Sequence, residues 1–257
     1  MTSSYLTSKL FFASQPLPSA FPQPNRHHSR CSIIRMSSTE TIEHVVLFKL
    51  KPQTPPAKLS AMLDGANSLK SLNQVLHLTA GPIHRNASSP SAPTFTHMLH
   101  SRYSSKSDLS TYNSHPDHIR VVREFIFPIC DDLMAVDWIS HAPSFHPIVT
   151  PPGSAMRVTF LKLKNGLAES VKAEAIEVVK GTKKLFGKIQ QSSFGENFSP
   201  DRAKGFSIAS LAIYPTLTDL EEADAAVEIL EEQRKKIGEF VDEVVAVDFV
   251  VIPPAAA

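Results

Sequence analysis

Apolar residues in the first half of the chain follow two spacings, one typical of strands and one typical of helices. After Thr54 and Pro55, which can begin a helix, apolar residues recur at steps of three and four as far as Leu72. Shorter helical patterns begin near residues 107 and 116. Strand-like apolar runs occupy 42–50, 75–81, 95–103 and 133–139. The order strand, helix, strand, strand, helix, strand is that of a ferredoxin-like unit.

The second half of the chain repeats this pattern at a constant spacing. Phe95–Tyr103 matches Phe206–Tyr214, and Ala135–Ile139 matches Ala246–Val250. One unit has therefore been duplicated. The second copy is expected to contain one long helix over 218–241, with a capping box that begins at Thr218. We predict a first unit at 41–140, a Pro-rich linker at 141–154, a second unit at 155–252 and a tail at 253–257.

Each predicted sheet would carry its helices on one face and leave the other face bare. The closing strand of each copy is largely apolar on both faces, so the bare face must be covered. Two copies in one chain can cover each other, and a second chain could do the same. We predict an α+β protein of two tandem ferredoxin-like (βαββαβ) units that pair into an α/β barrel.

Charge, apolar run length and cysteine content exclude several kinds of partner and site. Lys and Arg number 26 against 25 Asp and Glu, without a basic run interleaved with aromatic residues, so nucleic acid is not expected as a partner. No stretch of about 20 apolar residues is present, so no membrane span is expected. Cys31 and Cys130 are the only cysteines, which excludes a zinc site built on paired cysteines.

Residues 1–40 contain basic residues and almost no acid, with many Ser and Pro, which is typical of an organelle transit peptide. The opening resembles chloroplast leaders more than the Arg-rich mitochondrial kind. A disordered tail is the alternative, and Met36 could serve as a second start. We expect a chloroplast protein, with cytoplasm or peroxisome as alternatives if the leader is not used.

Four sequence elements resemble the stress-responsive dimeric α/β-barrel family, often abbreviated Dabb. They are His44–Lys51, Phe95–His97, the Tyr-x-x-His-Pro-x-His element at 112–118, and Val136–Trp138. The tandem arrangement is similar to that of plant two-domain stress-response A/B barrel proteins. The resemblance implies βαββαβ units whose sheets pair into a barrel, and a possible homodimer.

One plant member of that family, olivetolic acid cyclase, closes a linear polyketide by an aldol condensation without a cofactor. The resemblance to it implies that Tyr112 and His118 are catalytic and that His44 and His97 bind the ligand. His118 would remove a proton next to a carbonyl, and the Tyr112 hydroxyl would steady the enolate oxygen. Phe95 departs from the Tyr of that enzyme's third-strand motif.

Three functions remain open at this stage. The first unit could bind a small apolar or aromatic molecule, could catalyse an aldol cyclisation, or could be purely structural, with the 115–118 element fixing a helix start and the histidines serving as core residues. No metal-ligand spacing and no cofactor motif is present. The corresponding positions of the second copy are Arg157, Ile208, Ala223 and Ile229, so any such site belongs to the first unit. A polar loop at 195–205 carries two cations and could contact an anionic ligand or simply be solvated.

Overall fold

The computed structural model describes residues 40–140 and 150–252. Apart from residue 40, the predicted leader lies outside the described residues, as do residues 141–149 of the predicted linker and the tail. Within the described ranges, no helix combines the length and the apolar character that crossing a membrane requires.

The first unit forms an antiparallel sheet covered on one face by helices. Its strands are β1 (Thr41–Leu50), β2 (His77–Pro82), β4 (His97–Tyr103) and β5 (Cys130–Ser140), in the spatial order β2-β4-β1-β5. The covering helices are α1 (Pro56–Ser68), α2 (Lys106–Ser114) and α3 (Pro116–Val121). Short helical turns follow α1 at Leu69–Ser71 and α3 at Val122–Ile129.

The second unit repeats this topology. Its strands are β6 (Ala155–Leu163), β7 (Gln191–Glu196), β8 (Ile208–Tyr214) and β9 (Val241–Val250), in the order β9-β6-β8-β7. The helices are α4 (Glu169–Leu185), α5 (Leu217–Asp224) and α6 (Val227–Gly238), and a short 3-10 turn, η4, spans Pro200–Arg202. The predicted fold class is confirmed: both units have the ferredoxin-like strand order.

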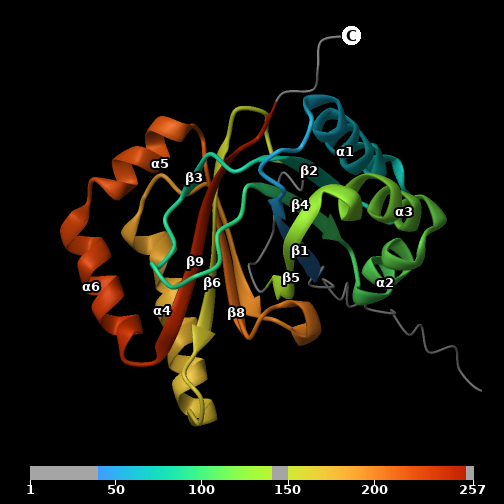
Figure 1. Cartoon of the computed structure of the whole chain (residues 1–257). Helices are drawn as coiled ribbons and strands as arrows, with labels where there is room; N and C mark the ends of the chain where they lie inside the picture. The colour runs from blue at the N-terminus through green and yellow to red at the C-terminus, as the bar shows by residue number, and fades with distance from the viewer. Residues whose placement is uncertain (1–39, 141–149, 253–257) are drawn as a thin grey trace, which may run out of the picture. The chain divides into compact units, whose positions relative to one another are not determined.

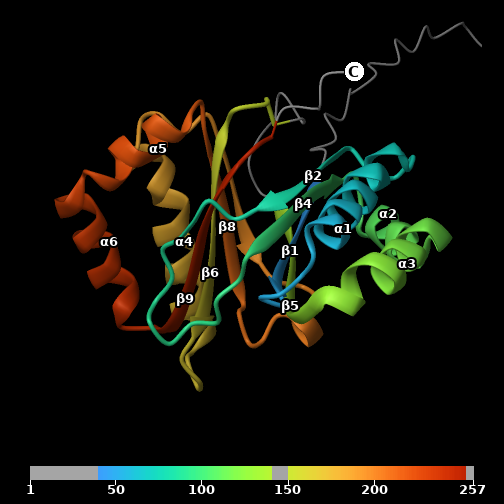
Figure 2. The same ribbon diagram turned by 45° about the horizontal axis from the view of Figure 1, so that its top comes forward.

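The two sheets pack face to face around a shared core. Figures 1 and 2 show α1–α3 on one outer side and α4–α6 on the other, with the strands between them. Every main strand except β2 and β7 contributes apolar side chains to this interior, where Leu47, Trp138 and Phe160, for example, are fully buried. The apolar inner faces of the sheets therefore cover each other, as the duplication predicted.

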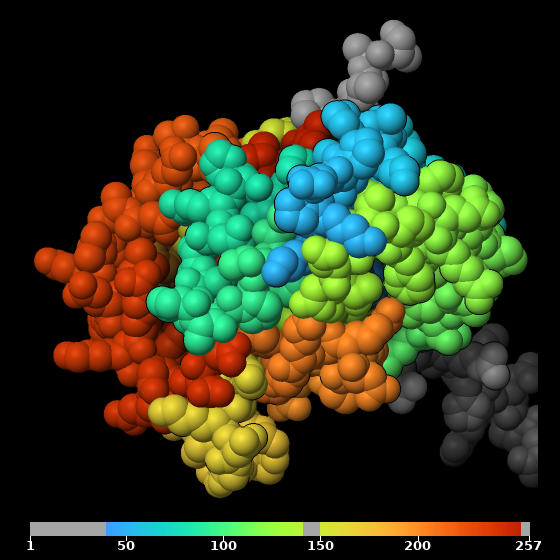
Figure 3. All heavy atoms as spheres, viewed as in Figure 1, coloured from blue at the N-terminus to red at the C-terminus, as the bar shows by residue number. Residues whose placement is uncertain are grey.

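Each unit also sends a segment to the sheet of the other. After β2, the short strand β3 (Arg85–Asn86) joins the edge of the second sheet beside β9, and the His84 amide donates to the Asp248 carbonyl at 2.8 Å. After β7, the Phe198 amide donates to the Asp137 carbonyl of β5 at 2.9 Å. Figure 3 shows the first crossing segment, in teal, on the surface against the red second unit. The crossings are equivalent and reciprocal.

A close backbone approach fixes the second crossing. A side-chain carbon at Gly195 would lie 2.7 Å from the carbonyl oxygen of Ile139, which cannot move away easily because it belongs to β5. The Trp138 indole also donates to the Ser193 hydroxyl at 2.8 Å. Glycine is therefore required at the end of β7 where it meets β5.

A buried ionic network lies between the sheets, on the same face as the apolar core. Glu43, His100 and Arg102 are fully buried; the Glu43 carboxylate accepts from His100 Nε2 at 2.6 Å and from Arg102 Nε at 3.1 Å. Arg102 also donates to the Gln191 side chain of β7 at 3.2 Å. Polar contacts as well as apolar packing thus connect the units.

Two sequence expectations about helix ends were wrong. Thr54 does not cap the first helix, because its hydroxyl donates to the Lys51 carbonyl at 2.8 Å. In the second unit the cap is Thr216, whose hydroxyl accepts from the Asp219 amide, and the expected long helix is divided into α5 and α6.

Candidate functional site

His44 and Asp137 form a buried pair at the centre of the first sheet. They are direct cross-strand neighbours on β1 and β5, and His44 Nδ1 bonds to Asp137 Oδ1. Only 3% of His44 and 2% of Asp137 is exposed. Both side chains lie on the sheet face that packs against the helices, because the residues beside them, such as Val45 and Val136, point into the shared core.

The Asp137 carboxyl group is ionised in this setting. Burial alone would raise its pKa, but the charge of His44 and the hydrogen bonds from His44 and Ser199 hold that pKa below its usual value. A carboxylate only accepts, so His44 Nδ1 carries a proton and donates it. The pair thus fixes the orientation of the His44 ring and leaves Nε2 for other contacts.

Two buried tyrosines stand beside His44. The ring centres of Tyr103 and Tyr112 lie 6.3 and 6.4 Å from that of His44, and 5.2 Å from each other. The Ser101 and Tyr103 hydroxyls are 2.9 Å apart, and Tyr103 is hydrogen-bonded in turn to Tyr112. Burial raises the pKa of both phenols, so both remain protonated and can donate.

His118 completes the cluster from α3. Its ring centre lies 4.5 Å from that of Tyr112, and its Nδ1 is 3.1 Å from the Asn113 carbonyl oxygen. A carbonyl accepts, so Nδ1 carries the proton and Nε2 keeps a free lone pair. Burial lowers the pKa of His118, the Asn113 bond opposes this in part, and the ring is neutral at neutral pH.

His97 is not part of this cluster. It lies on the same sheet face, but four residues along β4 from Ser101, the cross-strand partner of His44. That separation corresponds to about 13 Å. Its Nδ1 is 2.9 Å from the Thr96 hydroxyl, and its side chain is half-buried. The structure therefore brings together three of the four residues predicted to share a site.

Sequence reasoning missed Asp137, Tyr103 and the cap of α3. Asp137 belongs to a motif that had been noted, but its pairing with His44 depends on the register of β1 against β5, which a single sequence does not reveal. The cap of α3 is His115, whose Nδ1 accepts from the Asp117 amide at 3.2 Å. His118 lies one turn inside that helix.

The second unit supplies a wall of this cluster. Loop residues 197–204 lie on β5: Asn197 accepts from the Asp137 amide at 3.1 Å, and Lys204 pairs with Asp132 at 2.7 Å. Lys106 of α2 lies 4.1 Å above the Phe198 ring. The polar loop noted in the sequence is therefore docked against the first unit.

At the equivalent place in the second unit, a different cluster is found. Arg157 and Asp248 are cross-strand partners, and Arg157 Nε donates to Asp248 at 2.7 Å. Arg157 also donates to Asp224 of α5 at 2.5 Å, and Arg85 crosses from the first unit to bind both acids. The positions of His44, Tyr112 and His118 are occupied here by Arg157, Ala223 and Ile229, as expected, whereas Tyr103 has a counterpart in Tyr214.

Comparison with known proteins agrees with this architecture. The sequence profile described as "Stress responsive A/B Barrel Domain" matches residues 42–140 and again residues 156–251. The chain belongs to this family. The membership that the motifs predicted is confirmed, and each of the two units is an A/B barrel domain.

Two relatives from Arabidopsis thaliana match this chain across both units. Each is described as a stress-response A/B barrel domain-containing protein, and each is 45% identical to the chain. The match to the first covers 91% of this chain and 92% of the relative, and the match to the second covers 81% and 95%. A solved structure from Fusobacterium nucleatum, named as a candidate monooxygenase, covers 84% of this chain and 94% of its own with a TM-score of 0.60 and 14% identity, which indicates a common fold.

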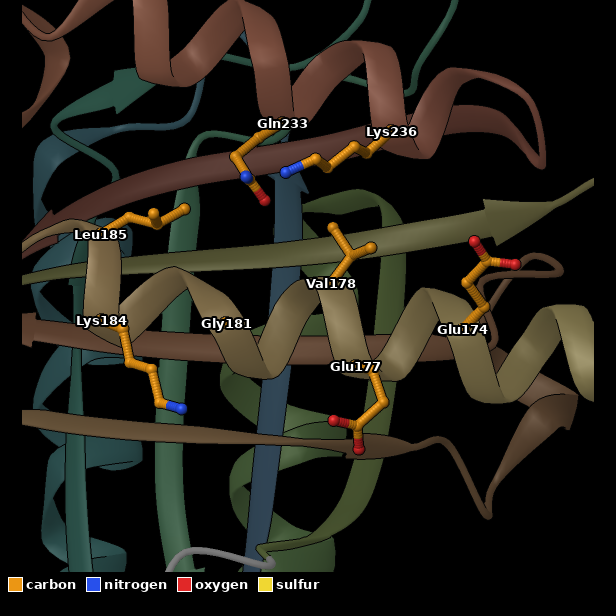
Figure 4. A pocket seen from close by; sticks show the side chains of 8 residues that line it. All are labelled: Glu174, Glu177, Val178, Gly181, Lys184, Leu185, Gln233 and Lys236. Atoms are coloured by element: carbon orange, nitrogen blue, oxygen red, sulfur yellow. The ribbon is translucent and has the colours of Figure 1, made fainter.

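Three surface hollows of the A/B barrel protein lie away from the His44 cluster. One of about 420 Å³ separates α4 from α6, with Glu177 and Lys236 among its lining residues (Figure 4). The others, about 480 and 400 Å³, lie beside Pro52 and beside Ser89. Among the described residues, no three or more His, Cys, Asp or Glu side chains are grouped to hold a metal ion.

Proposed function

We propose that the first A/B barrel domain binds a small aromatic or apolar molecule with a carbonyl oxygen, at His44, Tyr112 and His118. The observation that carries this proposal is the grouping of three polar rings: the ring centres of His44 and His118 lie 6.4 and 4.5 Å from that of Tyr112. The Tyr112 hydroxyl is protonated and His118 Nε2 keeps a lone pair, so the group combines a donor with an acceptor. A carbonyl oxygen of a ligand could accept from the Tyr112 hydroxyl.

The packing supports a site between the sheet and its helices rather than between the two sheets. The space between the sheets is occupied by core residues such as Leu47, Met98 and Phe160, which are almost completely buried. His118, by contrast, is half-buried and lies at the edge of the cluster on α3. Entry of a ligand past the His118 ring therefore requires a local movement of α3 and not the separation of the two units.

The proposal can be tested by ligand retention. The purified protein would be incubated with a panel of aromatic polyketides, and the retained compound measured after gel filtration. Tyr112→Phe removes only the donor, so we expect at least about a tenfold loss of affinity for the best compound. Ile229→Ala, at the position in the second unit that corresponds to His118, is the control and should bind normally. Equal retention by both variants would refute the site.

A second candidate function is proton transfer on the bound molecule. It is favoured by the state of His118, a neutral ring with Nδ1–H donated to Asn113 and Nε2 free to accept a proton. With the Tyr112 donor against it at 4.5 Å between ring centres, the pair has the two groups that an aldol cyclisation requires. His44 would be held by Asp137 as a second, oriented ring.

The proton-transfer candidate needs a kinetic test. Linear polyketide surrogates would be incubated with the protein, and cyclised product measured by chromatography. His118→Ala should lower the rate by about 10² to 10⁴ while changing binding of the surrogate much less. A rate in the wild-type protein no greater than in buffer would leave binding as the function of the site.

A further inference from the structure

We propose that the second domain controls the candidate site of the first, because Asn197 holds Asp137 in the position from which it orients His44. This inference rests on the proposed function and concerns the regulation of the same site. Asn197 is then a positioning residue, which acts on the His44 ring through Asp137 and not by contact with the ligand.

The backbone of Asp137 is bonded to the second domain and not to its neighbour β1. Strand β5 lies at the edge of the first sheet, so one side of its backbone has no partner within that sheet. On this side the Asp137 amide donates to Asn197 Oδ1 at 3.1 Å, and the Asp137 carbonyl accepts from the Phe198 amide at 2.9 Å. Both backbone groups of Asp137 therefore point away from His44, its cross-strand partner on β1.

This direction of the backbone brings the side chains of His44 and Asp137 together. Antiparallel partners that do not exchange backbone hydrogen bonds form the closer kind of pair, with Cα atoms about 4.5 Å apart. The bond from His44 Nδ1 to the Asp137 carboxylate is made in this setting. The contact with the second domain and the orientation of His44 thus depend on the same position of β5.

Asn197 is itself fixed within the second domain. Its amide donates to the Ser207 carbonyl at 2.9 Å and its Nδ2 to the Phe206 carbonyl at 3.2 Å, just before β8 begins. Its Oδ1 accepts from the Ser199 amide at 3.0 Å as well as from Asp137. The Ser199 hydroxyl bonds in turn to the Asp137 carboxylate. The amide, the carbonyl and the carboxylate of Asp137 are therefore each bonded to one of the residues 197–199.

Loss of this support should free the His44 ring. Without Asn197 Oδ1 the Asp137 amide has no acceptor, and β5 can move at its edge, so the bond between the Asp137 carboxylate and His44 Nδ1 opens more often. The second domain, docked on β5, thereby keeps His44 in the single orientation that leaves Nε2 for other contacts.

The duplication supplies a matched control. Asn86 and Asn197 lie at the same spacing in the repeat as Phe95 and Phe206, and Asn86 Nδ2 donates to the Phe95 carbonyl at 3.2 Å, as Asn197 Nδ2 does to that of Phe206. Asn86 belongs to β3, which pairs with β9 at the edge of the second sheet, away from Asp137. Alanine at either position removes the same kind of anchor from a crossing segment, but only Asn197→Ala releases Asp137.

Solvent exchange of the His44 Nδ1 proton measures this orientation directly and needs no ligand. A buried imidazole proton bonded to a carboxylate exchanges only when that bond opens, and NMR would compare the full-length protein with Asn197→Ala, Asn86→Ala and the milder Ser199→Ala. We expect exchange at least about tenfold faster in Asn197→Ala, a smaller increase in Ser199→Ala, and no change in Asn86→Ala. The His118 Nδ1 proton, bonded to the Asn113 carbonyl, should keep its rate in all three variants.

Affinity for the aromatic polyketide that the protein retains best then separates this inference from the proposed function. We expect Asn197→Ala to weaken that affinity and Asn86→Ala to leave it unchanged. If exchange responds as expected but the wild-type protein binds no compound, the proposed function fails, while the support of His44 by the second domain stands.

Three results would overturn the inference. They are equal exchange rates in Asn197→Ala and Asn86→Ala, unchanged exchange in both Asn197→Ala and Ser199→Ala, and faster exchange in Asn197→Ala with no loss of affinity. If Tyr112→Phe still weakens binding in any of these cases, the proposed function survives and only the control by the second domain is wrong.

Discussion

Ser199 and Arg85 occupy equivalent positions in the two halves of the molecule, and each contacts the acid of the opposite half. Ser199 bonds to Asp137, and Arg85 bonds to Asp248. The backbone around them is the same: the preceding amide donates to the carbonyl of that acid at 2.9 Å in one case and 2.8 Å in the other. Arg85 brings a positive charge to Asp248, whereas Ser199 brings a neutral hydroxyl to Asp137, so the duplicated framework now carries an ionic clamp in one half and a candidate site in the other.

The clamp should contribute strongly to stability. Arg157→Met would leave Asp248, whose side chain is 1% exposed, with Arg85 as its only remaining cationic partner among the described residues. Because a buried charge that loses a partner is costly, we expect a loss of about 3 kcal/mol in the free energy of unfolding, measured with urea. Lys180→Met, which breaks an exposed pair on α4, should cost less than about 1 kcal/mol. A similar loss in both variants would contradict this account of the clamp.

The contact between β7 and β5 should be sensitive to a single methyl group. Gly195→Ala would place its side chain 2.7 Å from the Ile139 carbonyl oxygen, and we expect it to lower the free energy of unfolding by about 2 kcal/mol or more. Gly181→Ala, in α4 with nothing within 4 Å of the new methyl group, should stabilise the protein by up to about 1 kcal/mol. Thermal unfolding of the two variants checks this, and destabilisation by both alike would speak against a specific close contact.

The network between the sheets predicts a loss of stability in acid. Burial and the nearby charges of His100 and Arg102 lower the pKa of His77 from 6.5 to about 3, so the unfolded chain takes up a proton that the folded protein refuses as pH falls below 6.5. Burial would raise the pKa of Glu43, but Arg102 and His100 lower it to about 2. The contribution of Glu43 to the free energy of unfolding is therefore complete above pH 4.5 and is lost as the pH falls below that value. Both Glu43 and His77 thus make the folded protein less stable as the pH falls.

We expect His77 alone to remove about 2 kcal/mol between pH 6.5 and 5, at about 1.4 kcal/mol per pH unit. Urea unfolding across this range measures the slope. His77→Asn should make the slope shallower. A flat profile for the wild-type protein would show that His77 is protonated in the folded state.

We propose that residues 1–40 direct the protein to the chloroplast, because their composition is that of a transit peptide. A fluorescent fusion of residues 1–45 should enter chloroplasts, and the same fusion starting at residue 41 should remain outside. Diffuse cytosolic fluorescence from the longer fusion would refute the proposal.

Sequence alone was sufficient for the fold and for part of the cluster. The duplication and the apolar spacing predicted the ferredoxin-like strand order, because both depend on local pattern. The crossing of Arg85 to the second sheet has no local signal, since a two-residue strand between turn residues cannot be distinguished from a loop. The same limit explains His97: its strand and face were predictable, but its distance from His44 depends on register. Asp137 was missed because its role depends on His44, its cross-strand partner, and a single sequence does not reveal that pairing.

The central claim is that the polar cluster of the first domain, and not the interior between the sheets, is the binding site. The most direct measurement is a titration with the aromatic polyketide that the protein retains best, followed by NMR of the imidazole nitrogens. We predict that the resonances of His44 and His118 shift together and saturate, while those of His77 and His100, which lie between the sheets, do not move. Shifts at His77 and His100, or none at His118, would contradict the account.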